Sequence, residues 1–188
     1  LEAEYTKANI RQIMTSCGAP GKLEKEIITP PDGELAELQN KILNGRSALI
    51  LGKTGRGKTT YIYDNTALLI TSGKYKYTEI KFWYVPEMCA YVRDGIDCNS
   101  YEQRLTNCCT IPLLIMDDLC KEQATANNNN IIKTILARRC DNGLQTLITS
   151  RFDSTEFKKR YEEDTLSRIL TMCIYKIEGK DRRKREDW

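Results

Sequence analysis

One eight-residue stretch has the residue types and the spacing that hold a triphosphate. Gly52, Gly57, Lys58 and Thr59 occupy the fixed positions of the pattern G-x-x-x-x-G-K-[ST]. Glycines let successive backbone N–H groups point at phosphate oxygens, the lysine brings a positive charge to the β- and γ-phosphates, and the threonine hydroxyl is a ligand for Mg²⁺. We therefore predict that ATP is bound by the following residues: Gly52, Lys53, Thr54, Gly55, Arg56, Gly57, Lys58, Thr59 and Thr60.

Two carboxylates, Asp117 and Asp118, follow an apolar run over residues 112–116. If this run is a strand beside the phosphate loop, its end lies at the sheet edge where ligands bind in open α/β folds. We predict that Asp117 holds Mg²⁺ together with Thr59, and that Asp118 orients or deprotonates the attacking water. Asp118 is one methylene shorter than glutamate, so we expect the rate of hydrolysis to suffer more than binding.

The composition excludes several other chemistries. The 188 residues contain no histidine, so His-based zinc sites, Ser-His-Asp triads and Cys-His pairs cannot form within the chain. The eight cysteines form no C-x-x-C pair, and we expect reduced thiols that lie mostly in the core. A net charge of +3 permits a nucleic-acid partner without requiring one. No signal peptide or membrane-spanning run is visible, which predicts a cytoplasmic protein.

Five apolar runs, over residues 48–51, 80–85, 113–116, 146–149 and 173–177, alternate with helical patterns. Runs that are almost continuously apolar are typical of strands covered on both faces of a parallel sheet. We predict helices over 33–43, 59–70 and 128–140, the last opened by an asparagine cap. The result is a three-layer α/β sandwich with a five-stranded parallel sheet. Breaks near residues 17–21 and 29–33 divide the chain into an N-terminal helical extension or linker, 1–32, and a main domain, 33–188.

An ordered set of motifs resembles the DnaC/DnaI-type helicase loaders and the related IstB-type transposition ATPases of the AAA+ class. The set comprises the phosphate loop, the paired aspartates, Ala137-Arg138-Arg139, Thr146-Leu147-Ile148-Thr149-Ser150, Leu166-Ser167-Arg168-Ile169-Leu170 and the segment 177–183. The likeness spans roughly residues 43–183. It implies a P-loop NTPase core without a separate helical lid, and ATP hydrolysis with Mg²⁺. It also implies ATP-dependent self-association in a ring or spiral, and a replicative DNA helicase and single-stranded DNA as partners of a protein encoded by a bacterium, a phage or a mobile element.

The resemblance also implies roles for individual residues. Arg138 or Arg139 corresponds to the arginine finger that acts on the ATP of a neighbouring subunit. Arg168 corresponds to a sensor-2-like arginine that contacts the γ-phosphate in its own subunit. The family usually ends its fourth strand in Thr-Ser-Asn, whereas this chain has Arg151 at the third position. Either Arg151 contacts phosphate or Ser150 supplies the missing polar contact, so ATP hydrolysis is expected to be slow or partner-dependent.

Two segments suit single-stranded DNA: the basic stretch 180–185, and Lys74-Tyr75-Lys76-Tyr77, where aromatic residues alternate with lysines. A solvated terminus and an edge-strand decoration are the alternatives. Residues 1–32 are too short for the helicase-gripping domain of the family, so either that domain was removed or this is a compact loader. An IstB-type accessory ATPase, a P-loop small-molecule kinase and a module that uses ATP as a structural ligand remain alternative functions.

Overall fold

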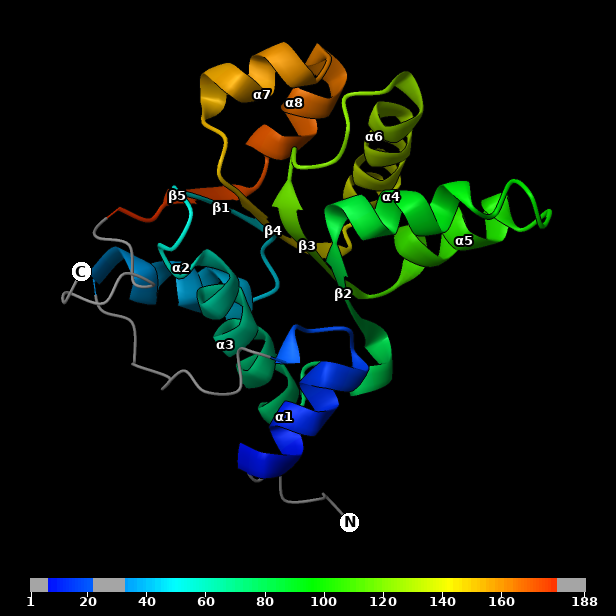
Figure 1. The fold of residues 1–188 in the computed structure, drawn as a ribbon. Coiled ribbons are helices and arrows are strands. Elements are labelled where there is room, and N and C mark those ends of the chain that lie inside the picture. The colour runs from blue at the N-terminus through cyan, green and yellow to red at the C-terminus, as the bar shows by residue number, and fades with distance from the viewer. Residues whose placement is uncertain (1–6, 22–32, 179–188) are drawn as a thin grey trace, which may run out of the picture.

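The computed structural model describes residues 7–21 and 33–178 and forms a three-layer α/β sandwich (Figure 1). Five strands pair in parallel in the order β2-β3-β4-β1-β5. They are β1 (Ala48–Leu51), β2 (Ile80–Tyr84), β3 (Leu113–Leu119), β4 (Gln145–Ser150) and β5 (Cys173–Lys176). The predicted fold class is confirmed.

Helices cover both faces of the sheet, as Figure 1 shows. One face carries α1 (Lys7–Ser16), α2 (Gly33–Leu43) and α3 (Lys58–Thr71); the other carries α4 (Val85–Arg93), α5 (Tyr101–Thr110), α6 (Ala126–Asp141), α7 (Ser154–Arg160) and α8 (Glu163–Leu170). A short 3₁₀ helix, Tyr77–Glu79, precedes β2. Each face has its own core because strand side chains alternate: Ile50 packs with Ile62 of α3, and Leu49 packs in the cluster of Ile135 of α6. The sheet is therefore covered on both sides, as its apolar strands predicted.

Three local expectations differ from the structure. β3 is longer than predicted and includes both aspartates, Asp117 and Asp118. β4 lies between β1 and β3, so the strand of the aspartates is not the neighbour of the phosphate-loop strand. Thr125, and not an asparagine, caps α6: its hydroxyl accepts a hydrogen bond from the backbone N–H of Asn128 at 3.2 Å. Asn128 is buried instead, and its side chain donates to the carbonyl of Gln123.

The described part of the first segment packs on the main domain. α1 contacts α3, and Met14 is fully buried in the core of that face. The carbonyl of Cys17 accepts a hydrogen bond of 2.7 Å from the N–H of Phe82, on the outer edge of β2. Gly18 has a φ of +96°, and a Cβ there would lie 2.5 Å from the carbonyl oxygen of Phe82, which explains why glycine makes this approach. The domain boundary at residue 32 stays a prediction, because residues 22–32 lie outside the described ranges.

All eight cysteines are free thiols, and most are buried. Burial raises the pKa of Cys89 and of Cys120 to about 12, so these thiols are unreactive at neutral pH. Within residues 7–21 and 33–178, no group of three or more Cys, Asp or Glu side chains is arranged to hold a metal ion. None of the described helices has the length and apolar character needed to span a bilayer.

Candidate nucleotide-binding site

The phosphate loop joins β1 to α3 and depends on glycine at three positions. Gly52, Gly55 and Gly57 have φ values of +149°, +79° and +83°, which disfavour residues with a Cβ. A Cβ at Gly52 would also lie 2.6 Å from the carbonyl oxygen of Ile177, which follows β5. Gly57 is the N-cap of α3, so the helix begins at Lys58. The sequence therefore curls the loop over the positive end of a 14-residue helix, an arrangement that attracts anions.

Lys58 lies inside this loop. Its side chain is 6% exposed, and its ammonium donates to the carbonyl oxygens of Gly52 at 2.7 Å and Lys53 at 3.1 Å. These bonds hold the ammonium group inside the curve of the loop, beside the first turn of α3. The loop thus offers backbone N–H groups, a helix N-terminus and one ammonium group to the same ligand.

Asp117 lies opposite the start of α3, between two hydroxyl groups. One carboxylate oxygen, Oδ1, accepts hydrogen bonds from the hydroxyls of Thr59 at 2.8 Å and Thr149 at 2.7 Å. Asp117 is 8% exposed, and burial raises its pKa although the two hydroxyls oppose that shift. A threonine hydroxyl beside a carboxylate is an oxygen donor set that fits Mg²⁺. The predicted pair of Thr59 and Asp117 is brought together.

Thr149 is a site residue that the sequence did not reveal. It stands in a motif of the resemblance, but a threonine in a buried strand has no distinguishing signal. Its hydroxyl bonds both aspartates: it donates to Asp117 and accepts from the backbone N–H of Asp118 at 2.9 Å. Since Thr149 is on β4, which lies between β1 and β3, strand order alone gives it this position.

Asp118 has a φ of +60°, at an irregularity of β3 where its pairing with β4 shifts register. Its carboxylate Oδ2 lies 3.4 Å from the ammonium of Lys121. That ammonium also lies 5.1 Å from the ring centre of Tyr84, at the end of β2. Asp118 is consequently held in place by its own turn and by a cation.

These groups surround a cavity of about 940 Å³. It is lined by Gly18, Pro20, Thr54–Thr60, Lys81–Tyr84, Glu87, Asp117, Asp118, Lys121 and Arg151. Most of the predicted nucleotide-binding residues and both aspartates therefore meet at one place. Gly18 and Pro20 also line the cavity, although nothing in their local sequence links them to a loop that begins at Gly52.

The polar residues after β4 divide into two roles. Ser150 is fully buried; its hydroxyl donates to the carbonyl of Leu119 at 2.7 Å and accepts from the N–H of Phe152 at 3.1 Å. It does not line the cavity, so the prediction that Ser150 supplies a contact to the nucleotide is corrected. Its hydroxyl instead joins the end of β3 to the segment after β4. Arg151 does line the cavity and is exposed there.

Arg139 is not available to a neighbouring subunit. It is 1% exposed, and its guanidinium donates to the Thr146 hydroxyl and to four carbonyl oxygens, those of Cys108, Ile111, Pro112 and Gln145. Burial lowers its pKa to about 10, which still leaves it charged at neutral pH. Its prediction as an arginine finger is corrected to a structural role, and the exposed Arg138 is left as the candidate.

Arg168 does not line the cavity either. It is in the last turn of α8, which precedes β5 and therefore ends at the edge of the sheet opposite the phosphate loop. Its guanidinium donates to the carbonyl of Asp164 at 3.1 Å and lies 3.9 Å from the carboxylate of Asp141, at the end of α6. The predicted contact with the γ-phosphate of its own subunit is corrected by this position. Arg138 and Arg168 share the far edge of the sheet.

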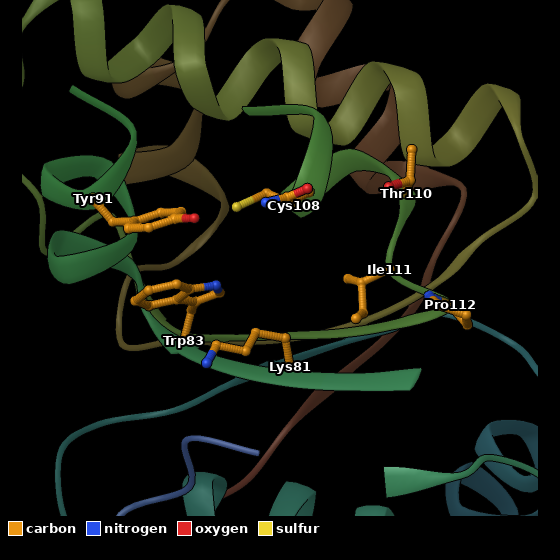
Figure 2. A pocket seen from close by; sticks show the side chains of 8 residues that line it. Lys81, Trp83, Tyr91, Cys108, Thr110, Ile111 and Pro112 are labelled. Atoms are coloured by element: carbon orange, nitrogen blue, oxygen red, sulfur yellow. The ribbon is translucent and has the colours of Figure 1, made fainter. Parts of the chain in front are cut away.

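A second cavity, of about 550 Å³, lies beside β2 (Figure 2). The rings of Trp83 and Tyr91 stack with their centres 5.1 Å apart. The ammonium of Lys81 lies 5.0 Å from the Trp83 ring, and the guanidinium of Arg104 lies 4.9 Å from the Tyr91 ring. In Figure 2 the polar edges of both rings face across the cavity toward Ile111. Lys81 and Trp83 also line the nucleotide cavity, so the two spaces are neighbours.

Of the two segments predicted to bind DNA, the structure describes only Lys74-Tyr75-Lys76-Tyr77. The ammonium of Lys74 donates to the carbonyl of Leu43 at 2.6 Å, and Tyr75 packs against the core. Tyr77 is 51% exposed. The basic stretch 180–185 lies outside the described residues.

The parallel sheet and the glycine-rich loop between β1 and α3 together give this chain the fold of a P-loop protein. No protein-family model matches the chain. The chain is 25% identical, over 158 residues, to the replicative helicase loader DnaI of Bacillus subtilis (strain 168), and the match covers 77% of this chain and 50% of that protein. The chain thus spans about half the length of the curated relative that it matches.

Two solved structures with the same fold are helicase loaders. A crystal structure of the DnaC helicase loader superposes with a TM-score of 0.65 at 19% identity, over 83% of this chain and 96% of that one. A crystal structure of DnaI gives a TM-score of 0.64 at 17% identity, over 84% and 93%. AMPPCP-bound DnaA from Aquifex aeolicus gives 0.69 at 15% identity, over 86% and 51%. The resemblance to the DnaC/DnaI-type helicase loaders is confirmed.

Proposed function

We propose that this chain binds ATP with Mg²⁺, hydrolyses the ATP, and helps to place a replicative DNA helicase on single-stranded DNA. The observation that carries the proposal is the contact between Thr59 and Asp117, 2.8 Å apart at the mouth of the phosphate loop. A triphosphate in that loop requires a divalent cation with oxygen ligands at this point. The sequence likeness to the loader DnaI supports the helicase as the partner.

The residues of the cavity divide the work of hydrolysis. Lys58 and the loop N–H groups bind the β- and γ-phosphates. Thr59 and Asp117 would hold Mg²⁺, which would supply further positive charge to the triphosphate. Asp118 orients a water molecule for attack on the γ-phosphorus and accepts its proton as the bond to the β,γ-bridging oxygen breaks. ADP and phosphate leave. Arg151, exposed in the cavity, supplies a positive charge near the transferred group.

The arginine finger belongs to a different subunit in this proposal. Arg138 is exposed near the end of α6, at the sheet edge opposite the phosphate loop, so it cannot reach the ATP of its own chain. An assembly in a ring or spiral brings that edge to the site of the next subunit. A trans-acting arginine accelerates phosphoryl transfer by about 10³–10⁵-fold in other NTPases. ATP that is contacted by two subunits also stabilises the assembly, because it binds the assembled form more tightly than the separate subunits.

Single-stranded DNA is proposed to contact the second cavity. Its lining residues include Lys81 and no carboxylate, and Arg104 adds a second cation beside the stacked rings of Trp83 and Tyr91. Aromatic rings beside cations are the groups that hold unpaired bases and the phosphates between them, at about 1–3 kcal/mol per stacked base.

Lys58→Ala tests the nucleotide site directly. We expect its affinity for ATP to fall roughly 10- to 100-fold, because a charge-assisted hydrogen bond contributes about 1.5–3 kcal/mol. Lys133→Ala is the control, since Lys133 on α6 forms exposed ion pairs with Glu162 and Asp164 at the start of α8 and does not line the cavity. Titration with a fluorescent ATP analogue measures both. Wild-type affinity in Lys58→Ala would show that the phosphate loop does not bind the nucleotide.

The partner is tested by co-purification with a hexameric replicative helicase in the presence of ATP, Mg²⁺ and single-stranded DNA. We expect a complex whose yield depends on ATP. A complex with a transposase instead would favour an IstB-type function, and transfer of the γ-phosphate to a metabolite by a monomer would favour a kinase.

A further inference from the structure

A buried charge follows the paired aspartates and has no part in the proposed chemistry. Glu122 lies three residues after β3, and its side chain is 1% exposed. Its partner Arg160, at the end of α7, is 38 residues further along the chain. One guanidinium nitrogen of Arg160 donates to both the carboxylate Oε1 and the main-chain carbonyl of Glu122, each at 2.9 Å. The hydroxyl of Tyr161 donates to the same Oε1 at 3.0 Å.

This cluster is a poor source of stability. Burying two ions costs several kcal/mol each, which only complete hydrogen bonding repays. Here the second carboxylate oxygen of Glu122 and the Nε of Arg160 are buried, and within the described structure neither has a hydrogen-bond partner. Well-packed apolar side chains at such positions are often as stabilising or more so. The benefit of the ion pair must therefore be sought in the geometry that it fixes.

The cluster joins two of the segments that carry side chains into the nucleotide cavity: 118–122, with Asp118, and 151–161, with Arg151. Glu122 lies between β3 and α6, four residues after Asp118, and Arg160 ends α7, the helix that follows Arg151. A second link lies closer to the sheet, where the buried hydroxyl of Ser150 donates to the carbonyl of Leu119. The two segments are thus joined twice, by Ser150 and Leu119 at the ends of β4 and β3 and by Arg160 and Glu122 further along the chain.

The loop after β3 needs such a restraint. Asp118 and Cys120 have φ values of +60° and +74°, a conformation that costs a residue with a Cβ about 1–2 kcal/mol. Without an anchor, the loop is free to relax to ordinary backbone angles, and the carboxylate of Asp118 moves with it. The buried contacts of Glu122 oppose that relaxation.

We propose that Glu122, Arg160 and Tyr161 are positioning residues that fix the distance between Asp118 and Arg151 in the cavity. The inference rests on the proposed function, because its main readout is ATP hydrolysis. The phosphate loop lies on β1 and α3, outside both loops. Loosening the cluster should therefore lower the rate of hydrolysis and leave nucleotide affinity unchanged.

Single substitutions strand the remaining charge and are expected to destabilise the fold, since breaking one side of a buried pair is strongly unfavourable. The test therefore uses the paired variant Glu122→Leu/Arg160→Met, which replaces both ions by apolar groups of similar volume. The matched control is Glu162→Leu/Lys133→Met, which removes an ion pair of similar length, 2.8 Å, that is exposed and whose two residues do not line the cavity. Arg160→Lys in the wild-type background keeps the positive charge, and it tests whether that charge alone preserves the rate of hydrolysis.

Each variant is measured for thermal midpoint, for the Kd of ATP with Mg²⁺, and for single-turnover hydrolysis at saturating ATP. We expect the paired variant to melt no lower than wild type, to bind ATP within about twofold of wild type, and to hydrolyse it 10- to 100-fold more slowly, roughly the cost of a misplaced catalytic group. Arg160→Lys should retain more of the rate than the paired variant, and the control should change nothing.

Wild-type hydrolysis by the paired variant would overturn the proposal, as would an unchanged rate at saturation with a Kd raised tenfold. If wild-type protein binds ATP but never hydrolyses it, the proposed function fails. The positioning claim is then decided by amide hydrogen exchange in the paired variant. Faster exchange over residues 118–124 and 151–161, with no change over 52–60, supports it, and unchanged exchange in those two loops contradicts it.

Discussion

At the residue scale, the site depends on one oxygen atom shared by two strands and a helix. Oδ1 of Asp117 accepts from Thr59 on α3 and from Thr149 on β4. Burial raises the pKa of this carboxyl, and each donated hydrogen bond partly restores the charged form. Thr149 therefore acts on the charge of Asp117, the metal ligand of the proposed function.

Thr149→Val should weaken ATP binding only in the presence of Mg²⁺. Loss of its hydrogen bond raises the pKa of Asp117 further, so a larger fraction of the carboxyl is protonated as the pH falls from neutral toward that pKa. We expect the Mg²⁺-dependent part of the affinity to drop about 5- to 10-fold, corresponding to one hydrogen bond of about 1–1.5 kcal/mol, and to drop further at lower pH. Titrations with and without Mg²⁺ at several pH values measure this effect.

Thr149→Ser keeps the hydroxyl and is the control for that experiment. Its Mg²⁺ dependence and its pH profile should match those of the wild-type protein. An equal loss of affinity with and without Mg²⁺ in Thr149→Val would mean that the side chain supports the fold of the cavity and has no effect on the charge of Asp117.

At the element scale, the phosphate loop is locked between β1 and the segment after β5. The N–H of Ile177 donates to the carbonyl of Leu51 at 2.8 Å, and its own carbonyl approaches Gly52 so closely that no Cβ fits. The buried guanidinium of Arg139 has a similar function at the opposite edge, where it joins α5, β3 and β4 through four carbonyl oxygens. Both sets of hydrogen bonds are accepted by main-chain carbonyl groups, and both fix strand ends.

Gly52→Ala should therefore destabilise the fold by more than the cost of a positive φ at alanine. A left-handed φ costs alanine about 1 kcal/mol, and the close approach to Ile177 adds a displacement of backbone that cannot be relieved by a side-chain rotation. We expect a loss of more than about 2 kcal/mol in the free energy of unfolding, measured by urea denaturation, together with reduced ATP affinity.

Gly73→Ala is a matched comparison, because Gly73 has a φ of +73° and no atom within 4 Å of its Cβ position. It should cost about 1 kcal/mol and leave ATP binding intact. Equal effects in the two variants would show that the contact between the loop and Ile177 contributes nothing.

At the scale of the whole molecule, the charges divide between the two edges of the sheet. Lys58, Asp117, Asp118 and Arg151 meet at one edge. Arg138 and Arg168 are near the ends of α6 and α8, and so at the other edge. A single chain cannot bring the two sets together, because a helix that follows a parallel strand returns to the edge where the next strand begins.

Mixing two inactive variants tests whether the far edge acts on a neighbour. Arg138→Ala should bind ATP normally and hydrolyse it at least about 10³-fold more slowly, which is the smallest effect expected for the loss of an arginine finger. Asp118→Asn should also bind ATP and hydrolyse it slowly, because its own site lacks the carboxylate that orients the attacking water. A mixture should regain hydrolysis, because an Asp118→Asn subunit supplies Arg138 to the intact site of the other variant. Additive, unrescued rates would exclude Arg138 as the finger.

The sequence by itself determined the layers, the strands and the phosphate loop. Apolar runs, helical periodicity and glycine positions act over a few neighbouring residues, so they can be recognised from local sequence. The pattern from Gly52 to Thr59 predicts phosphate binding in the same way. It also predicted that Thr59 and Asp117 lie together, because that pairing follows from the motifs.

Only the tertiary structure decided which arginines are free and which polar groups are joined. Arg138 and Arg139 are neighbours in sequence, yet one is exposed and the other is 1% exposed, because the helix turns them about 100° apart and only one meets the ends of β3 and β4. The contacts of Glu122 with Arg160, and of Cys17 with Phe82, link residues 38 and 65 positions apart. Such contacts depend on strand order and on the way the helices return across the sheet, and these are properties of the whole fold that no local pattern encodes.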